Sequence, residues 1–385
     1  MTRNNWSVPE TEVLQRVHER LDADSADVLA TIVDVEGNAY RRPGAKMLLD
    51  EAGDGVGSIT AGCLEDDLLA AAQSVREDGQ PELLTYDLMD DEDDVWGLGV
   101  GCNGIIDVLL EPLTETYRPA VEAFADGRNV AVLTVLEDSK GALDRGDRAY
   151  YHPGDGGLTT PDGEPAPAWP DELADPAKDL AERGRADTIE LDSQDRRLAV
   201  FIDGLAAPTE LVIFGSGHDV GPVTELAAKN DFRVTVVGFR GSVDLEDRFP
   251  DADDTLTTSP AAVDDDLELG DRTYAVVMTH NFIDDRLTVE QLLDASVGYI
   301  GLMGPHKRFE KMLAEFEDEG RSFDDETLAS LYTPIGLDLG GGSPYQIAHS
   351  IVAEILAVSN DRTPRHLRTR EGHIHDRITV DSPPQ

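Results

Sequence analysis

The sequence predicts an α/β protein made of an N-terminal α/β domain with short strands and a C-terminal, Rossmann-like, doubly wound parallel sheet. Three observations lead to this prediction. From about residue 210, apolar runs alternate with helical patterns, as in parallel sheets covered by helices on both faces. A glycine-rich turn follows the first of these runs directly. Before residue 205, short apolar runs are separated by tight turns.

The first part of the chain is predicted to form a helix, then short strands, then a second helix and a further strand. Cys63 lies close to the start of the second helix, and Cys102 lies in a glycine loop directly before the further strand. In chain order, the predicted elements are a helical pattern within 10–29, strands at 28–35 and 46–49, a helix from 64 to 72, and a strand at 105–110.

The middle of the chain, residues 128–203, contains two further strand candidates, at 130–136 and 198–202. Proline and glycine cluster between them at 153–170, which predicts a surface excursion or a linker. No internal repeat is apparent in the sequence. The C-terminal strands are expected at 211–214, 234–237, 274–278 and 299–302. We therefore expect domains at 1–205 and 206–362, and a flexible tail at 363–385.

The composition excludes some functions. The chain has 385 residues, 78 of them Asp or Glu and 32 Lys or Arg, which gives a net charge of −46. A broad basic face for nucleic acid is therefore not expected. The apolar fraction of 40% predicts a folded protein, and acidic residues spread along the whole chain suggest adaptation to a salt-rich cytosol that screens their repulsion.

Nothing in the sequence predicts a membrane segment or a disulfide framework. The first nine residues contain no apolar stretch, and no segment approaches the roughly 18 apolar residues that a span requires. We expect a soluble, cytoplasmic protein, in which Cys63 and Cys102 serve thiol chemistry.

The turn after the strand at 211–214 is the first candidate binding site. Gly215 and Gly217 let the backbone approach a phosphate group at the start of the next helix. The third glycine, Gly221, is displaced by one position from the common spacing. Gly238 stands where NAD-binding domains carry an acid for the ribose, which weakens ordinary NAD binding. The alternative is a glycine turn that serves packing only.

Basic residues near this turn also have two interpretations. Arg240 or Arg248 could meet a phosphate, but an exposed arginine on an acidic protein is more often one partner of a solvated ion pair.

The two cysteines have different surroundings. A helix N-terminus favours the thiolate of Cys63, although cysteine is also a common buried apolar residue. Cys102 is flanked by Gly99, Gly101 and Gly104, whose missing side chains would admit a bulky ligand.

Two further segments are candidates. Ser343, Pro344 and Gln346 predict a capped helix start after a glycine loop, which is either a second anion site or simply a well-formed helix. His280 ends a strand at the edge where parallel sheets bind ligands, but such a histidine is as often structural. His373 and His375 are too sparse to predict a metal site.

Taken together, these segments resemble the xanthine dehydrogenase accessory factor family, the XdhC/CoxI group. The resemblance rests on motifs that occur in the family's order: 36–37 with 41–45, Gly57-Ser58 with Gly62-Cys63-Leu64-Glu65, Gly97-Leu98-Gly99-Val100-Gly101-Cys102, 213–218, 278–280, 299–304 and 334–340. Departures from the family's pattern are Asn103-Gly104 after the second cysteine, Gly238, and Pro305-His306-Lys307-Arg308.

The resemblance implies a chaperone-like role for which catalysis stays uncertain. Members bind the molybdenum cofactor, a molybdopterin with or without an added nucleotide, hold it while a cysteine desulfurase installs its terminal sulfur, and deliver it to a molybdenum hydroxylase. By matching motif, Cys102 is the first candidate for cofactor contact, including contact with the molybdenum, and Cys63 is the second. The other candidate contacts are Gly99, Gly101, Gly215, Gly217, His218 and His280.

Two rival functions stay open. The turn from Gly215 to Gly221 would suit an NAD(P)-dependent oxidoreductase, although no obvious catalytic acid–base set accompanies it. An interaction protein with an empty Rossmann domain is the other. Whichever function holds, a homodimer is the default expectation for the protein.

Overall fold

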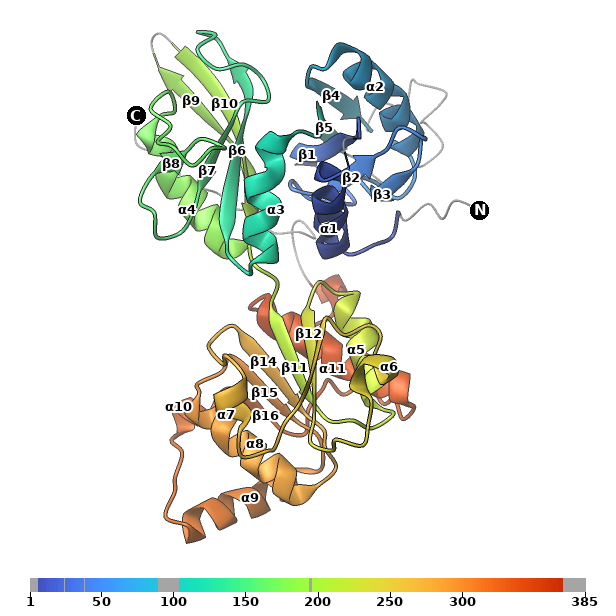
Figure 1. Cartoon of the computed structure of the whole chain (residues 1–385), viewed down its shortest axis with the longest axis vertical. Helices are drawn as coiled ribbons and strands as arrows, with labels where there is room; N and C mark the ends of the chain where they lie inside the picture. Colours follow the sequence, from blue (N-terminus) through green and yellow to red (C-terminus); the bar gives the residue numbers. More distant parts are fainter. Residues whose placement is uncertain (1–5, 24, 38, 89–103, 194–195, 370–385) are drawn as a thin grey trace. The chain divides into compact units, whose positions relative to one another are not determined.

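The computed structural model describes residues 6–23, 25–37, 39–88, 104–193 and 196–369. These residues form two compact units (Figure 1). The first extends to Ala207 and includes the short helix Leu367–Thr369, and the second is Pro208–His366.

The first unit contains two antiparallel sheets, each of five strands. The first sheet has the order β3-β2-β1-β5-β4, and the second has the order β8-β7-β6-β10-β9. The strands are β1 (Val28–Gly37), β2 (Lys46–Leu49), β3 (Gly55–Gly57), β4 (Glu82–Asp87), β5 (Gly104–Pro112), β6 (Val130–Asp138), β7 (Arg148–Tyr151), β8 (Leu158–Thr159), β9 (Ala186–Ser193) and β10 (Arg196–Leu205). The helices are α1 (Glu10–Leu21), α2 (Glu65–Asp78), α3 (Arg118–Ala125) and α4 (Ala174–Arg183).

The two sheets belong to two copies of one structural repeat. Each repeat runs helix, three strands, helix, two strands: α1-β1-β2-β3-α2-β4-β5 and then α3-β6-β7-β8-α4-β9-β10. The two sheet orders correspond strand for strand. The expectation that the chain has no internal repeat was therefore wrong.

Local details repeat as well. A β-bulge interrupts the pairing of β1 with β5, and a matching one interrupts the pairing of β6 with β10. Gly44 and Gly146 enter β2 and β7 with φ of +95° and +90°, a region that favours glycine. Gly79 and Gly184 both end the second helix of their repeat in the left-handed conformation. Agreement in bulges, turns and caps indicates a tandem duplication.

Two buried ion pairs cross between the repeats. Lys46 on β2 lies 2.7 Å from Asp203 on β10, and Arg148 on β7 pairs with Glu111 on β5. All four side chains are at most 7% exposed. Lys46 and Arg148 hold the same position in their repeats, opposite Thr31 and Thr134 respectively. Such an exchange of partners is what an approximate two-fold axis between the repeats produces.

Apolar side chains of both repeats surround these pairs. One cluster combines Leu29 and Leu48 of the first repeat with Val132 and Tyr150 of the second. Helices α1 and α3, one from each repeat, pack together beside it. Burial raises the pKa of the Glu111 carboxyl, and the charge of Arg148 opposes that shift. The buried charges therefore depend on their pairing.

The Pro- and Gly-rich segment 153–170 is largely exposed, as expected for a surface excursion, but it is not a linker. It contains β8, and Ala166 and Trp169 are buried against the core of the second sheet. The apolar area that Trp169 removes from water explains why this segment stays on the sheet.

The second unit is a parallel sheet of six strands in the order β13-β12-β11-β14-β15-β16. Helices α5 and α11 contribute to the core on one face, and α8 and α9 to the core on the other. This confirms the doubly wound, Rossmann-like prediction. The elements are β11 (Glu210–Phe214), α5 (Val220–Ala228), β12 (Arg233–Gly238), α6 (Leu245–Arg248), β13 (Asp254–Thr257), α7 (Val263–Asp266), β14 (Thr273–Val277), α8 (Phe282–Asp294), β15 (Tyr299–Leu302), α9 (His306–Asp318), α10 (Asp325–Leu328), β16 (Leu331–Tyr332) and α11 (Pro344–Ser359).

We predict that Lys46→Met lowers the free energy of unfolding by about 3–5 kcal/mol, because it leaves the Asp203 carboxylate buried without its partner. Urea unfolding measures this effect. The matched control is Lys229→Met, which removes a lysine from an exposed ion pair with Glu225 and should change stability little. Equal effects of the two substitutions would contradict the importance given to the crossed pairs.

Candidate functional site

Three of the segments that the sequence analysis singled out meet at one edge of the first sheet, the edge formed by the ends of its strands. Strands β1, β3 and β4 end at this edge, while β2 and β5 begin there, as the pairings of Gly37 with Gly104 and of Met47 with Gly57 require. The edge therefore receives the β1–β2 connection with Arg41, the β3–α2 connection with Cys63, and both ends of the segment 88–103.

The loop that carries Cys63 is fixed by Thr60 and Glu65. Glu65, 1% exposed, accepts hydrogen bonds from the Thr60 hydroxyl (2.7 Å), the Thr60 N–H (3.1 Å) and the Leu64 N–H (3.0 Å). The Thr60 hydroxyl oxygen in turn accepts from the N–H groups of Gly62 and Cys63. Cys63 is half-buried against the core, directly before the first turn of α2, as predicted. The loop is therefore rigid at the position from which the Cys63 side chain projects.

A basic residue lies on the same edge. Arg41 pairs with Glu10 of α1 and lies 3.5 Å from the Ser58 hydroxyl. Its charge is therefore already balanced by a carboxylate within the unit.

Cys102, Gly99 and Gly101 lie outside the described residues. Their segment ends at Gly104, the first residue of β5, whose carbonyl accepts a hydrogen bond from the Leu88 N–H (3.0 Å). In the second repeat, the corresponding connection between β9 and β10 consists only of residues 194 and 195. The long glycine- and cysteine-containing connection is therefore a feature of the first repeat alone.

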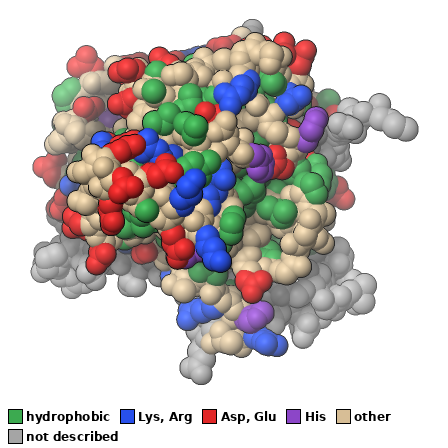
Figure 2. Space-filling view, turned by 90° about the horizontal axis from the view of Figure 1, so that it is seen from below, with side chains coloured by type: hydrophobic (Ala, Val, Ile, Leu, Met, Phe, Trp, Pro, Cys, Tyr) green, Lys and Arg blue, Asp and Glu red, His purple; other side chains and the backbone are tan. Residues whose placement is uncertain are grey.

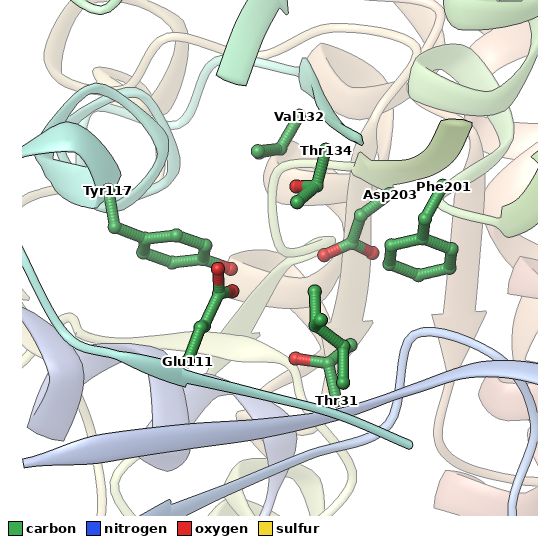
Figure 3. A pocket seen from close by; sticks show the side chains of 8 residues that line it. Thr31, Glu111, Tyr117, Val132, Thr134, Phe201 and Asp203 are labelled. Carbon is green, nitrogen blue, oxygen red and sulfur yellow. The ribbon is translucent and has the colours of Figure 1, made fainter. Parts of the chain in front are cut away.

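A small cavity lies where the two repeats meet (Figure 3). The Tyr117 hydroxyl points toward the Glu111 carboxylate there, with Asp203 across the cavity. Its volume of about 10 Å³ for a water-sized sphere admits about one water molecule, which excludes a pterin. It is lined by Thr31, Leu109, Glu111, Tyr117, Val132, Thr134, Phe201 and Asp203. We assign it to the polar centre of the repeat interface, since Lys46 and Arg148 balance its two carboxylates.

The second candidate site is at the carboxyl ends of the parallel strands, which run downward in Figure 1; Figure 2 shows the surface of the molecule from below. Basic and histidine side chains lie among the acidic ones on that face. The order of the sheet reverses between β11 and β14, the point where doubly wound sheets bind ligands. The glycine turn follows β11, and His280 follows β14.

A side-chain hydrogen bond joins these two segments. His280 Nε2 lies 2.7 Å from Asp219 Oδ2, so the turn after β11 and the turn after β14 are directly connected. On the other side of the glycine turn, Arg248 donates a hydrogen bond to the Ser216 carbonyl (2.6 Å). Of the two arginines considered from the sequence, Arg248 therefore lies at the turn, while Arg240 pairs with Asp284 (2.6 Å).

His280 is held in an uncommon backbone conformation, with φ of +60°. The preceding residue, Thr279, is fixed by Asp285, which accepts hydrogen bonds from its N–H and hydroxyl. Arg308 pairs with the second oxygen of Asp285 from the start of α9. Buried partners thus fix the residue next to His280 and hold its backbone in this conformation at the sheet edge.

The glycines of the turn have different surroundings. A Cβ on Gly215 would lie 2.8 Å from the Met278 carbonyl oxygen, so this glycine is required for close packing of β11 on β14. A Cβ on Gly217 would lie 2.4 Å from Asp219 Oδ1. His218 is exposed beside them. The structure thus brings Gly215, Gly217, His218 and His280 together, and it adds Asp219, which the sequence analysis missed.

The glycine loop before α11 favours the simpler of its two interpretations. Ser343 and Gln346 form the predicted capping box, and Gln346 Oε1 also accepts hydrogen bonds from the N–H groups of Gly342 (3.0 Å) and Ser343 (3.2 Å). These donors are therefore used by the helix start itself, and the segment is not retained as an anion site.

Two kinds of feature are absent from the described part of the chain. No group of three or more His, Cys, Asp or Glu side chains there could hold a metal ion. Within the same residues, no helix combines the length and the apolar character needed to cross a bilayer.

Comparison with known proteins agrees with the folds of both units. Residues 21–87 match the model of the XdhC and CoxI family, and residues 211–355 match the XdhC Rossmann domain. The chain is 31% identical over 347 residues to a Bacillus subtilis protein described as a probable xanthine dehydrogenase subunit, covering 88% of this chain and 96% of that protein. It is 28% identical over 178 residues to the uncharacterized protein YqeB of Escherichia coli, covering 46% of this chain and 32% of that protein.

A solved structure is also similar over most of its length. The crystal structure of a xanthine dehydrogenase from Bacillus halodurans superimposes with a TM-score of 0.72 at 29% identity, covering 92% of this chain and 96% of that one. Because both family models match in order, and the Bacillus subtilis protein is covered almost completely, the chain belongs to the XdhC and CoxI family.

Proposed function

We propose that this chain binds the molybdenum cofactor, holds it while a cysteine desulfurase installs its terminal sulfur, and delivers it to a xanthine-dehydrogenase-type molybdenum hydroxylase. One observation carries the proposal: the Arg41 connection, the Cys63 loop and both flanks of the Cys102 segment meet at one edge of the first sheet. Membership of the family makes the chain an accessory protein related to xanthine dehydrogenase maturation.

The described residues of this edge fit such a ligand. A thiol is a suitable soft contact for molybdenum, and Cys63 presents one from a rigid loop at the start of a helix of 14 residues. When bound, the cofactor supplies the metal and its dithiolene sulfurs. The chain's own part is to orient it through thiol and backbone contacts and to limit its exposure to water.

The residues are assigned as follows. Cys102 is the main cofactor contact, since it stands two positions before Gly104 at the start of β5, and Cys63 is the second. Gly99 and Gly101, which have no side chains, are assigned to the same contact as neighbours of Cys102 in the sequence. In the second unit, Gly215, Gly217, His218 and His280 form a separate candidate contact for a phosphate-bearing group.

The proposal includes partners and a setting. The chain would act in the cytoplasm, as a homodimer, with a hydroxylase apoenzyme and a cysteine desulfurase as its protein partners. The acidic surface, with a net charge of −46, makes these contacts dependent on ionic strength.

We predict that Cys102→Ala lowers the molybdenum content of protein purified without oxygen by about tenfold or more, because a direct contact to the cofactor is lost. Elemental analysis and oxidised-pterin fluorescence measure the two parts of the ligand. Cys63→Ala should lower both by a smaller factor. Melting curves matching the parent protein establish that both variants fold, and equal molybdenum in Cys102→Ala and the parent would rule out the assignment.

An NAD(P)-dependent oxidoreductase is the second candidate, favoured by the glycine turn at the switch point between β11 and β14. At a concentration about a hundredfold above its Kd, a nicotinamide cofactor would raise Tm by roughly 5 °C or more. We predict no such shift with NAD⁺ or NADP⁺, because Gly238 replaces the ribose-binding acid and Arg240 is paired with Asp284. A shift of that size would favour the oxidoreductase.

A further inference from the structure

We propose that Asp219 is an internal competitor for an anion site at the glycine turn of the second unit. Its carboxylate, held by His280, occupies the place at which a phosphate or diphosphate group would approach the turn. The site therefore admits a phosphate-bearing ligand only when that ligand displaces Asp219 from His280. This inference concerns ligand selection in the Rossmann unit and does not depend on what the cysteine-bearing edge binds.

The position of the Asp219 carboxylate carries the first step. In dinucleotide-binding turns, the second glycine leaves open the face that the pyrophosphate approaches. Gly217 is that glycine here, and a Cβ built on it would lie 2.4 Å from Asp219 Oδ1 and 3.9 Å from His280 Cδ2. The face that Gly217 leaves open is therefore covered by the chain's own carboxylate.

The second step is the contact that keeps the carboxylate there. Asp219 Oδ2 lies 2.7 Å from His280 Nε2. His280 extends from a turn that Asp285 fixes through Thr279, so the backbone that carries the imidazole is positioned independently of Asp219. An anionic ligand would find the same imidazole in place once Asp219 moved away.

A cationic side chain, Arg248, completes the site. Arg248 donates to the Ser216 carbonyl within the same turn (2.6 Å), and its side chain is exposed. With Asp219 displaced, the turn would offer a guanidinium, an imidazole and backbone N–H groups to one anion. With Asp219 in place, a like charge opposes that anion.

The ligand class follows from the neighbouring strand. A Cβ on Gly238 would lie 3.1 Å from the Leu245 side chain, so packing accounts for this glycine and leaves no acid for an adenosine ribose. Arg240, which could meet a ribose phosphate, is paired with Asp284. The site therefore selects for the phosphate or diphosphate group itself and gives little advantage to an adenosine.

The test is a gain of binding. Isothermal titration of Asp219→Asn with inorganic pyrophosphate should give a Kd about tenfold or more below that of the parent chain, because the competing charge is removed. ADP should show the same gain within about threefold. The double variant with His280→Asn should lose the gain; asparagine tolerates the left-handed backbone at that position.

The matched control is Asp251→Asn, which removes one exposed carboxylate close to Lys229, at the opposite end of α5. Asp219→Ser provides a second variant if the asparagine substitution lowers Tm. The proposal fails if the parent chain already binds pyrophosphate as tightly as the variants, if Asp251→Asn gives the same gain, or if the gain survives the loss of His280. If the substitution lowers the Kd for ADP by a factor more than tenfold larger than for pyrophosphate, the proposed ligand class is wrong.

Discussion

The crossed ion pairs between the two repeats are the constraint on which the first unit depends. Four charges buried this deeply are stabilising only while each keeps its partner, so the pairs of Lys46 with Asp203 and of Arg148 with Glu111 tolerate a single relative placement of the repeats. That placement brings α1 against α3 and closes the apolar cluster around Leu29 and Val132. With β1 and β5 fixed in this way, the edge where β1 ends and β5 begins can carry the loops that we propose bind a ligand.

The two repeats of this unit share one fold but differ in the connections between their strands. The second repeat has a short connection between β9 and β10, and its segment around Trp169 is packed onto its own sheet. The first repeat has the rigid Cys63 loop and the long segment that ends at Gly104. The second copy thus has a short connection between its last two strands, while the first has a long one at the matching edge, where loops can vary without disturbing the core.

The sequence predicted the elements whose signals are local. Strands β2 and β15 match their apolar runs residue for residue, and the parallel sheet and the Ser343 cap follow from equally local patterns. The repeat was missed because the corresponding positions that stay identical, such as Gly44 and Gly146, are widely spaced in the chain, while Lys46 and Arg148 keep only their charge. The contact of Asp219 with His280 was missed because two different strand ends, far apart in the chain, bring it together.

The central claim is that the chain carries a cofactor for another protein, and transfer of that cofactor tests it most directly. The protein would be purified without oxygen, in high salt, from cells that make the cofactor, and mixed with a xanthine-dehydrogenase-type apoenzyme. The account predicts that molybdenum leaves this chain, appears in the hydroxylase in equal amount, and restores its activity. If the protein contains no molybdenum, or if its molybdenum stays bound and the apoenzyme remains inactive, the account is contradicted.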